Sequence, residues 1–238
     1  GGIGSHLSPV LCQYLQALVQ AGKAQQETVV FIDNKSYEPR KANRQVFTET
    51  GNKAEVTAAR MSQMFPCLTT EAKPHFVTAA NIFLFIKEGD TVFLCVDNHA
   101  TRKLVSDHCV SLKNVTLISG GNDLRKGTVQ VHIRKNGGNV TPPITFLHPE
   151  IEKPEDHNPA DMGCEELAQA GAPQLIFTNH MTASHMLCRW WLENQGEIGY
   201  SELSFGIHGT ARAVLRREGE TPATTTEVSH VDRGENRT

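Results

Sequence analysis

Short runs of apolar, β-branched residues alternate along this chain with segments of helical periodicity. The runs that predict buried strands lie at 28–32, 92–96, 115–118 and 128–133, and the helical segments lie at 5–20, 53–64, 100–109 and 175–192. Parallel strands need a crossover connection, and helices in those crossovers cover both faces of the sheet. The chain is therefore expected to be an α/β domain with a mostly parallel sheet, whose ligands bind at the carboxyl ends of the strands.

The segment 137–163 interrupts this alternation. It combines three glycines, five prolines and several acidic residues, which predicts a long, exposed and flexible crossover loop, and loops of this length are usually functional. From residue 218 onward the chain is rich in Thr, Glu and Arg, which is typical of a disordered tail. With 238 residues in all, we expect one domain over 1–217 and a tail over 218–238.

Composition excludes several classes of function. The formal net charge is only -3, without a block of like charges, so nucleic acid is not an expected partner. The longest apolar stretches, such as 82–86, are far shorter than the roughly 20 residues of a membrane-spanning helix. Six cysteines occur without a C-x-x-C pair, which argues against structural zinc and favours a reducing cytoplasm.

Glycines crowd the start of the chain, where Gly1, Gly2 and Gly4 precede the first helical segment. Glycine lets the backbone approach a phosphate, and the N-terminus of the following helix supplies positive potential. This pattern favours a phosphate-binding turn that includes Gly2 and Gly4. Taken alone, it is equally compatible with a flexible start of the chain.

Acidic residues follow two of the predicted strands. Asp33 closes the run 28–32, where its carboxylate can accept hydrogen bonds from both hydroxyls of a ribose. Asp97 and Asn98 follow the run 92–96, with Arg102 about one helical turn further on. A carboxylate there can hold Mg²⁺ together with substrate phosphates. The structural alternatives are a surface turn for Asp33 and a helix N-cap for Asp97 or Asn98.

A third cluster carries positive charge. Asn43, Arg44 and Gln45 precede Lys53 at the head of the helical segment 53–64. An arginine fork and a lysine could lie on either side of a triphosphate and neutralise charge as it develops. Each residue taken singly is more often a solvated surface group.

As a set, these motifs resemble the ThiF/MoeB/ubiquitin-activating superfamily, over about residues 1–134. The resemblance implies a Rossmann-like fold that uses ATP and Mg²⁺ to adenylate the C-terminal glycine carboxylate of a ubiquitin-like or sulfur-carrier protein. It also implies a homodimer, and in conjugation pathways a downstream conjugating enzyme. The function predicted from the sequence is therefore that of an adenylyltransferase.

The roles implied by the resemblance transfer residue by residue. Gly2 and Gly4 would lie against the nucleotide, and Asp33 would hold the ribose. Phosphates would be bound by Asn43, Arg44 and Lys53, with Gln45 beside them in the motif. Asp97 would organise the metal ion, and Asn98 would line the same pocket.

The chain departs from the family pattern at several points. Arg40-Lys41-Ala42 stands where the family usually has Ser-Asn-Leu, so one asparagine ligand is missing and Lys41 is a candidate substitute. The first strand and first glycine of the fingerprint would precede Gly1. The paired zinc cysteines are absent, which favours the zinc-free branches and conjugation over sulfur transfer. Cys164, at the end of the loop, is a candidate nucleophile for a thioester, and Cys109 a weaker one.

Two other functions remain open from the sequence. A Rossmann oxidoreductase that binds NAD would also use glycines, a helix, a strand and Asp33. It would have no use for Asn43-Arg44-Gln45 and Lys53. A catalytically silent scaffold subunit of this superfamily would usually lack the arginine, the lysine or the metal-site aspartate, and this chain has all three.

Overall fold

The computed structural model of the 238-residue chain describes every residue except 48, 147, 163–173, 198, 217–225 and 228–238. Its helices are α1 (Gly2–Gln20), α2 (Lys53–Met64), α3 (Ile82–Phe85), α4 (His99–Ser111), α5 (Pro149–Glu152) and α7 (Ile176–Asn194), with two 3₁₀ turns at Pro39–Lys41 and Pro159–Asp161. All four predicted helical segments are confirmed. Helix α1 begins three residues earlier than expected, because the glycines themselves form its first turn.

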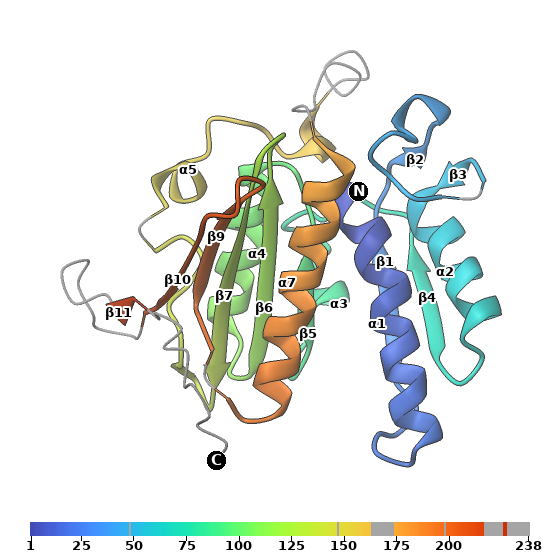
Figure 1. Ribbon diagram of the computed structural model, residues 1–238, viewed down its shortest axis with the longest axis horizontal. Coiled ribbons are helices and arrows are strands. Elements are labelled where there is room, and N and C mark those ends of the chain that lie inside the picture. Colours follow the sequence, from blue (N-terminus) through green and yellow to red (C-terminus); the bar gives the residue numbers. More distant parts are fainter. Residues whose placement is uncertain (48, 147, 163–173, 198, 217–225, 228–238) are drawn as a thin grey trace, which may run out of the picture.

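The strands form two main sheets (Figure 1). In the smaller sheet, β1 (Thr28–Ile32) pairs in parallel with β4 (Thr69–Lys73). The larger sheet has the order β11-β10-β9-β7-β6-β5. Its strands are β5 (Thr91–Leu94), β6 (Val115–Asn122), β7 (Lys126–Lys135), β9 (Glu202–Gly206), β10 (Ala211–Leu215) and β11 (Thr226–Glu227), with β8 (Gly138–Asn139) beside β7. Strands β2 (Ser36–Tyr37) and β3 (Gly51–Asn52) pair antiparallel and form a separate two-stranded sheet.

Parallel pairing is confined to the part of the fold that carries the predicted site. Strand β1 is parallel to β4, and β5 is parallel to β6. The other pairs are antiparallel: β6 pairs with β7, β7 with β9, and β9 with β10. The expected α/β fold is confirmed, but the parallel arrangement does not extend beyond β6. The reason is local, since only three residues separate β6 from β7, too few for a crossover.

Helices cover both faces of the larger sheet, as expected. Successive side chains of β6 point to opposite faces. Ile118 packs in a core with residues of α1 and α7, such as Leu7 and Met186, whereas Leu117 packs with residues of α3 and α4, such as Val105. In Figure 1, α7 lies in front of this sheet and α4 behind it. None of the helices in the described part of the chain is long and apolar enough to span a bilayer.

The predicted crossover loop at 137–163 is more ordered than its composition suggests. It contains β8, α5 and a 3₁₀ turn, and Ile144 and Ile151 are buried. The expectation of a wholly exposed loop is therefore wrong, because these two side chains anchor it to the rest of the fold. In the predicted tail, Thr226 and Glu227 pair with β10, and residues 218–225 and 228–238 lie outside the described residues.

A groove of about 570 Å³ separates β1 from β5. Apolar side chains of both strands and of α1 line it, among them Phe31, Phe93 and Leu11. Gly1, Asp33 and Lys53 also line it, so the predicted site opens into this groove. The strand expected ahead of Gly1 stays a prediction.

Candidate functional site

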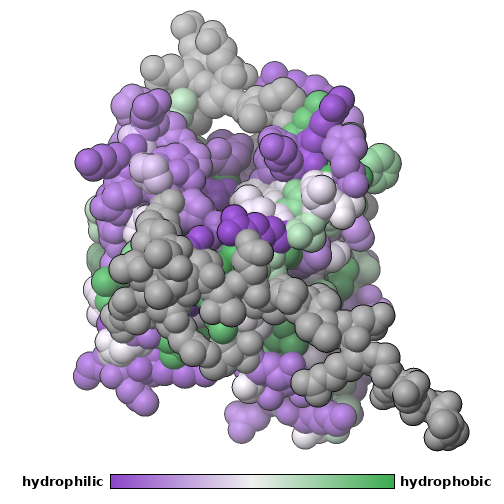
Figure 2. All heavy atoms as spheres, turned by 60° about the vertical axis from the view of Figure 1, so that its left-hand side comes forward, coloured by the Kyte–Doolittle hydropathy of each residue, from purple (hydrophilic) through white to green (hydrophobic). Residues whose placement is uncertain are grey.

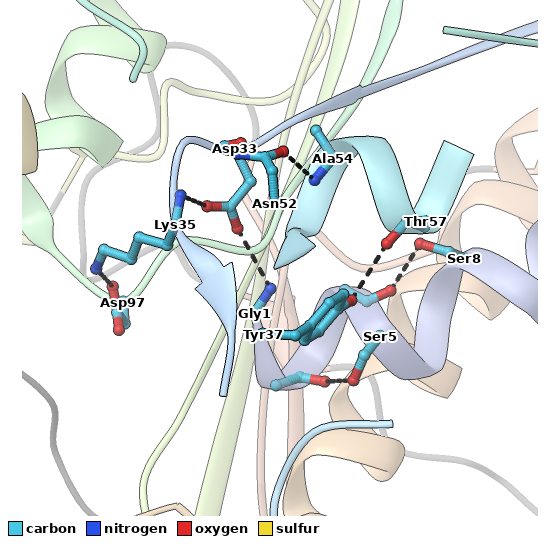
Figure 3. Close-up of polar contacts among 12 residues, drawn as sticks. Gly1, Ser5, Ser8, Asp33, Lys35, Tyr37, Asn52, Ala54, Thr57 and Asp97 are labelled. Carbon is cyan, nitrogen blue, oxygen red and sulfur yellow. Dashed lines mark hydrogen bonds and ion pairs between the residues drawn. The ribbon is translucent and has the colours of Figure 1, made fainter. Parts of the chain in front are cut away.

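The start of α1 lies against the carboxyl end of β5 and close to that of β1. A Cβ atom at Gly1 would lie 3.3 Å from the Cys95 carbonyl oxygen, just beyond β5. The Gly1 nitrogen lies 3.6 Å from Asp33 Oδ2, just beyond β1. In Figure 3 the Asp33 carboxylate points toward the Gly1 nitrogen, and Asp97 lies to one side, joined to the turn after β1 through the Lys35 side chain. The carboxyl ends of the two strands thus meet at one helix N-terminus, the place expected for a ligand in this kind of sheet.

The first turn of α1 presents open backbone donors. The first intrahelical hydrogen bond runs from the Ser5 amide to the Gly1 carbonyl at 3.1 Å, and the N-cap Gly1 contributes no side-chain hydrogen bond. The amides of Gly2, Ile3 and Gly4 consequently have no acceptor within the helix. Together with the positive end of the helix dipole, they form a site suited to a phosphate group.

Gly2 is also required by packing. A Cβ atom there would lie 2.4 Å from Asn179 Nδ2 on α7, which no side chain could accommodate without movement. A Cβ at Gly4 would lie 3.7 Å from the Cys95 Cβ, an ordinary contact. The close approach of α1 to α7 therefore explains the glycine at position 2, and the contact of Gly2 and Gly4 with a nucleotide stays a prediction.

Backbone hydrogen bonds hold the loop between β1 and β2 in place. Asp33 Oδ1 accepts from the Lys35 amide at 2.8 Å, and Asn52 Nδ2 donates to the Asp33 carbonyl at 3.1 Å. The Lys53 amide donates to the Lys35 carbonyl at 2.9 Å. Asn52 Oδ1 in turn accepts from the amides of Ala54 and Glu55 and caps α2. Asp33 and Lys53 are thereby fixed relative to each other.

Lys53 is a buried cation. It is only 5 % exposed, and its ammonium lies 5.9 Å from the centre of the Tyr37 ring, within the range of a cation–π contact. Burial lowers the pKa of Lys53, and the nearby Asp33 carboxylate only partly opposes this effect. A desolvated ammonium beside an open helix N-terminus is arranged to receive an anion.

Asp97 is half exposed and ionised. Burial opposes its ionisation, but Lys35 and other nearby cations outweigh that effect and keep the pKa of its carboxyl below the usual value. Lys35 Nζ lies 3.8 Å from Asp97 Oδ1. Among the described residues no three His, Cys, Asp or Glu side chains gather as a metal site. A single carboxylate is enough for Mg²⁺ when phosphates and water complete its shell, and binding of a metal ion by Asp97 stays a prediction.

In contrast to those of α1, the N-terminal amides of α4 donate to side chains of the protein itself. Asn98 Oδ1 accepts from the Thr101 amide at 2.7 Å, which is the N-cap role considered for it. Asp156, from the crossover segment, accepts from the amides of His99 and Ala100 at 2.7 and 2.8 Å. Arg102 bonds to the Val96 and Gly120 carbonyl oxygens and is structural. Of these two helices, α1 is thus the one with amides open to a phosphate.

The Asn43-Arg44-Gln45 segment lies beside the same end of α1. The Val46 amide donates to Ser5 Oγ at 3.0 Å, and Asn179 Nδ2 donates to the Arg44 carbonyl at 2.9 Å. Asn43 is exposed and Gln45 is buried. The structure thus brings the segment to α1 and α7, whereas Asp33, Lys53 and Asp97 form the other side of the site. Binding of phosphates by Asn43, Arg44 and Gln45 stays a prediction.

The two candidate nucleophiles, Cys164 and Cys109, and the candidate phosphate ligand Lys41 have different outcomes. Cys164 lies outside the described residues. Burial raises the pKa of Cys109 to about 12, so this thiol is a poor nucleophile at neutral pH. The Lys41 ammonium pairs with Glu38, and its role as substitute for a missing asparagine stays a prediction.

Three residues with clear places at the site were missed by the sequence reasoning. Lys35 pairs with Asp97, Asn179 connects α7 to Arg44, and Asp156 caps α4. Lys35 had a detectable signal, since it lies two residues after Asp33 in the same turn. Asn179 and Asp156 gave none, because they are 135 and 57 residues distant in sequence from the groups that they contact.

The end of the molecule that carries this site is polar. Figure 2 shows hydrophilic side chains over most of the upper part of the face viewed there, the end at which the N-terminus lies in Figure 1. Apolar side chains line the groove below, as described above. A polar surface at the carboxyl ends of β1 and β5 agrees with a site for a charged, phosphate-bearing molecule.

Comparison with known proteins places the chain among proteins of related fold. The curated protein "Adenylyltransferase and sulfurtransferase UBA4" of Lodderomyces elongisporus is 29% identical over 158 residues, which are 65% of this chain and 32% of that protein. Crystal structures of E. coli MccB with AMPCPP and MccA and with ATP match with TM-scores of 0.62 and 0.62, at 16% and 15% identity. They cover 92% and 93% of this chain, which spans 63% and 62% of those chains.

Family membership rests on a direct match. The chain spans about a third of the length of the curated relative, so that relative's whole activity does not carry over by itself. The model of the ThiF family, in contrast, matches residues 1–181, which include α1, the ends of β1 and β5, and every predicted site residue. The chain belongs to the ThiF family.

Proposed function

We propose that this chain adenylates the C-terminal glycine carboxylate of a ubiquitin-like or sulfur-carrier protein, using ATP and Mg²⁺. The observation that carries the proposal is the meeting of Asp33, Lys53 and Asp97 at the open N-terminus of α1. Membership of the ThiF family supports it, as do the name of the UBA4 relative and the crystallisation of MccB with ATP. Assembly as a homodimer and a downstream conjugating enzyme stay predictions from the resemblance.

In this reaction two anions must meet. A carboxylate oxygen bonds to the α-phosphorus of ATP, the bond from that phosphorus to the bridging oxygen breaks, and pyrophosphate leaves with the electron pair. No proton is transferred, so the protein needs no general base. It has to hold both anions in line and neutralise their charge.

The described residues suit these tasks. The open amides of α1 and the buried Lys53 ammonium face the phosphates, and Asp33 accepts from the ribose hydroxyls. Asp97 would hold Mg²⁺, which when bound supplies further positive charge to the phosphates. Because Lys53 is desolvated before the nucleotide arrives, its charge acts on the phosphates with little screening by water.

The direct test is ATP–pyrophosphate exchange that depends on a small protein with a Gly-Gly tail. We expect radiolabel from pyrophosphate to enter ATP only when the carrier is present, and not when the carrier lacks its last two residues. Binding of NAD in preference to ATP would instead favour an oxidoreductase. Exchange absent with every such carrier tested, despite ATP binding, would favour a silent scaffold.

The thioester on Cys164 is a separate proposal with its own test. Cys164→Ala is expected to abolish a carrier adduct that thiol reagents release, while pyrophosphate exchange continues at the wild-type rate. The two readouts separate because the thiolate attacks only after the acyl-adenylate has formed. Cys109→Ala is the control and is expected to leave the adduct in place, since burial raises the pKa of that thiol to about 12. An adduct that survives in Cys164→Ala would refute the thioester.

A further inference from the structure

Lys35 links the ends of two strands that belong to different sheets. It lies in the turn after β1, and its side chain reaches Asp97 after β5, with Nζ 3.8 Å from Oδ1 (Figure 3). Its ammonium therefore lies beside the carboxylate that suits a metal ion. Neither the family motifs nor the roles described above assign a function to this side chain.

The backbone of Lys35 is held independently of its side chain. Its amide donates to Asp33 Oδ1 at 2.8 Å, and its carbonyl accepts from the Lys53 amide at 2.9 Å. Both contacts involve backbone atoms of residue 35, so they are available to any residue there except proline, which lacks the amide hydrogen. A change of this side chain therefore tests its charge and not the shape of the loop.

The ion pair between Lys35 and Asp97 is weak enough for another cation to replace the ammonium. The Asp97 side chain is 49% exposed and that of Lys35 is 28% exposed. Pairs with this much access to water are weak, because the solvent competes for both partners. A divalent cation, which also binds the phosphates of a nucleotide, would displace the ammonium from this carboxylate.

Lys35 can reduce the repulsion between the carboxylates of the site and the phosphates of a nucleotide. Asp33 and Asp97 both lie near the N-terminus of α1, where the phosphates are expected. A nucleotide that arrives without a metal ion meets the negative charge of both. The Lys35 ammonium offsets the charge of Asp97, and its flexible stem lets it turn to a phosphate oxygen.

We propose that Lys35 stands in for the metal ion, neutralising Asp97 and holding the phosphates of metal-free ATP until a divalent cation takes the carboxylate. This inference rests on the proposed function, since it assumes an ATP site. It makes Lys35 a positioning residue that sets how strongly nucleotide binding depends on metal. The lysine contributes most when the metal is absent and least when Asp97 is already occupied.

The test is titration of ATP into Lys35→Met by calorimetry, in EDTA and in Mg²⁺. Loss of one charge-assisted contact should raise the Kd in EDTA by about tenfold or more. In Mg²⁺ the Kd should change by less than about threefold. The Mg²⁺ concentration needed for half-maximal tightening should fall, because no ammonium then competes for Asp97. Lys35→Arg, which keeps the charge, should retain binding in EDTA.

Lys103→Met is the matched control. Lys103 pairs with Asp107 on α4, and its side chain is 30% exposed, close to the value for Lys35. It should bind ATP like the wild type in both buffers. Equal loss of affinity for Lys35→Met in both buffers, or no loss in either, would overturn the inference. Failure of the wild type to bind ATP in either buffer would overturn the proposed function itself.

Discussion

Lys53→Met is expected to lower pyrophosphate exchange by about 100-fold or more without loss of folded stability. The ammonium is desolvated and lies where the phosphates are expected, so a neutral side chain of similar length removes charge and little packing. Methionine is a good helix former, and the backbone amide of residue 53, which bonds to the Lys35 carbonyl, is unchanged. Activity and stability should therefore separate in this variant.

The stability part of this prediction has a definite dependence on pH. The folded-state pKa of Lys53 is lowered from its ordinary value of 10.5, chiefly by burial. The unfolded chain therefore binds the proton more tightly. The free-energy cost of burying the charged Lys53 is complete at pH values below its folded-state pKa. It disappears as pH rises from that pKa to 10.5. Lys53→Met should equal or exceed the wild type in stability at low pH, with the difference shrinking as pH rises.

Radiolabel exchange measures the loss of activity in Lys53→Met, and urea unfolding across this pH range measures its stability relative to the wild type. Lys103→Met, which removes a partly buried lysine of α4 that lies outside the site, should leave exchange unchanged. A Lys53→Met protein that unfolds at clearly lower urea would show that the ammonium supports the fold. Exchange near the wild-type rate in a folded variant would remove Lys53 from the site.

The helices and central strands were predictable because their signals are local. Residues 53–64 show a helical period and match α2, and the apolar run 28–32 matches β1. Strand β4 escaped notice because its sequence, Thr-Thr-Glu-Ala-Lys, has neither an apolar run nor clear alternation. The antiparallel pairing beyond β6 was not predicted, since the sheet was expected to be mostly parallel. It arises because the turn between β6 and β7 is too short for a crossover.

The site was predictable only where strand ends mark it. Asp33 and Asp97 follow two predicted strands, and the carboxyl ends of such strands are where ligands bind. The prediction that 28–32 is buried was wrong, since no residue of β1 is buried and Val30 is 39% exposed. The open amides of α1 and the closed amides of α4 could not be told apart in the sequence, because the closing carboxylate of Asp156 comes from a distant segment. The packing role of Gly2 against Asn179 was hidden for the same reason. Contacts between distant segments decide which helix N-terminus is free to bind a ligand.

Asp97→Asn is expected to reduce Mg²⁺-dependent exchange by about 100-fold or more, yet leave ATP binding in EDTA unchanged or tighter. Nearby cations hold the pKa of Asp97 below its usual value, so the substitution removes a full negative charge at neutral pH. An amide binds Mg²⁺ poorly without that charge. In EDTA, however, the same loss relieves repulsion of the phosphates and frees Lys35 to contact them.

Asp107→Asn is the matched control for Asp97→Asn. Asp107 is also paired with a lysine, and its side chain is 56% exposed against 49% for Asp97. Exchange and ATP affinity should both stay at wild-type values in this control. A general disturbance of the site by Asp97→Asn would weaken ATP binding in EDTA as well as in Mg²⁺, which would argue against a metal-binding carboxylate. Lost exchange in Mg²⁺ together with unchanged or tighter ATP binding in EDTA is expected only if the charge of Asp97 serves a metal ion that is bound with the nucleotide.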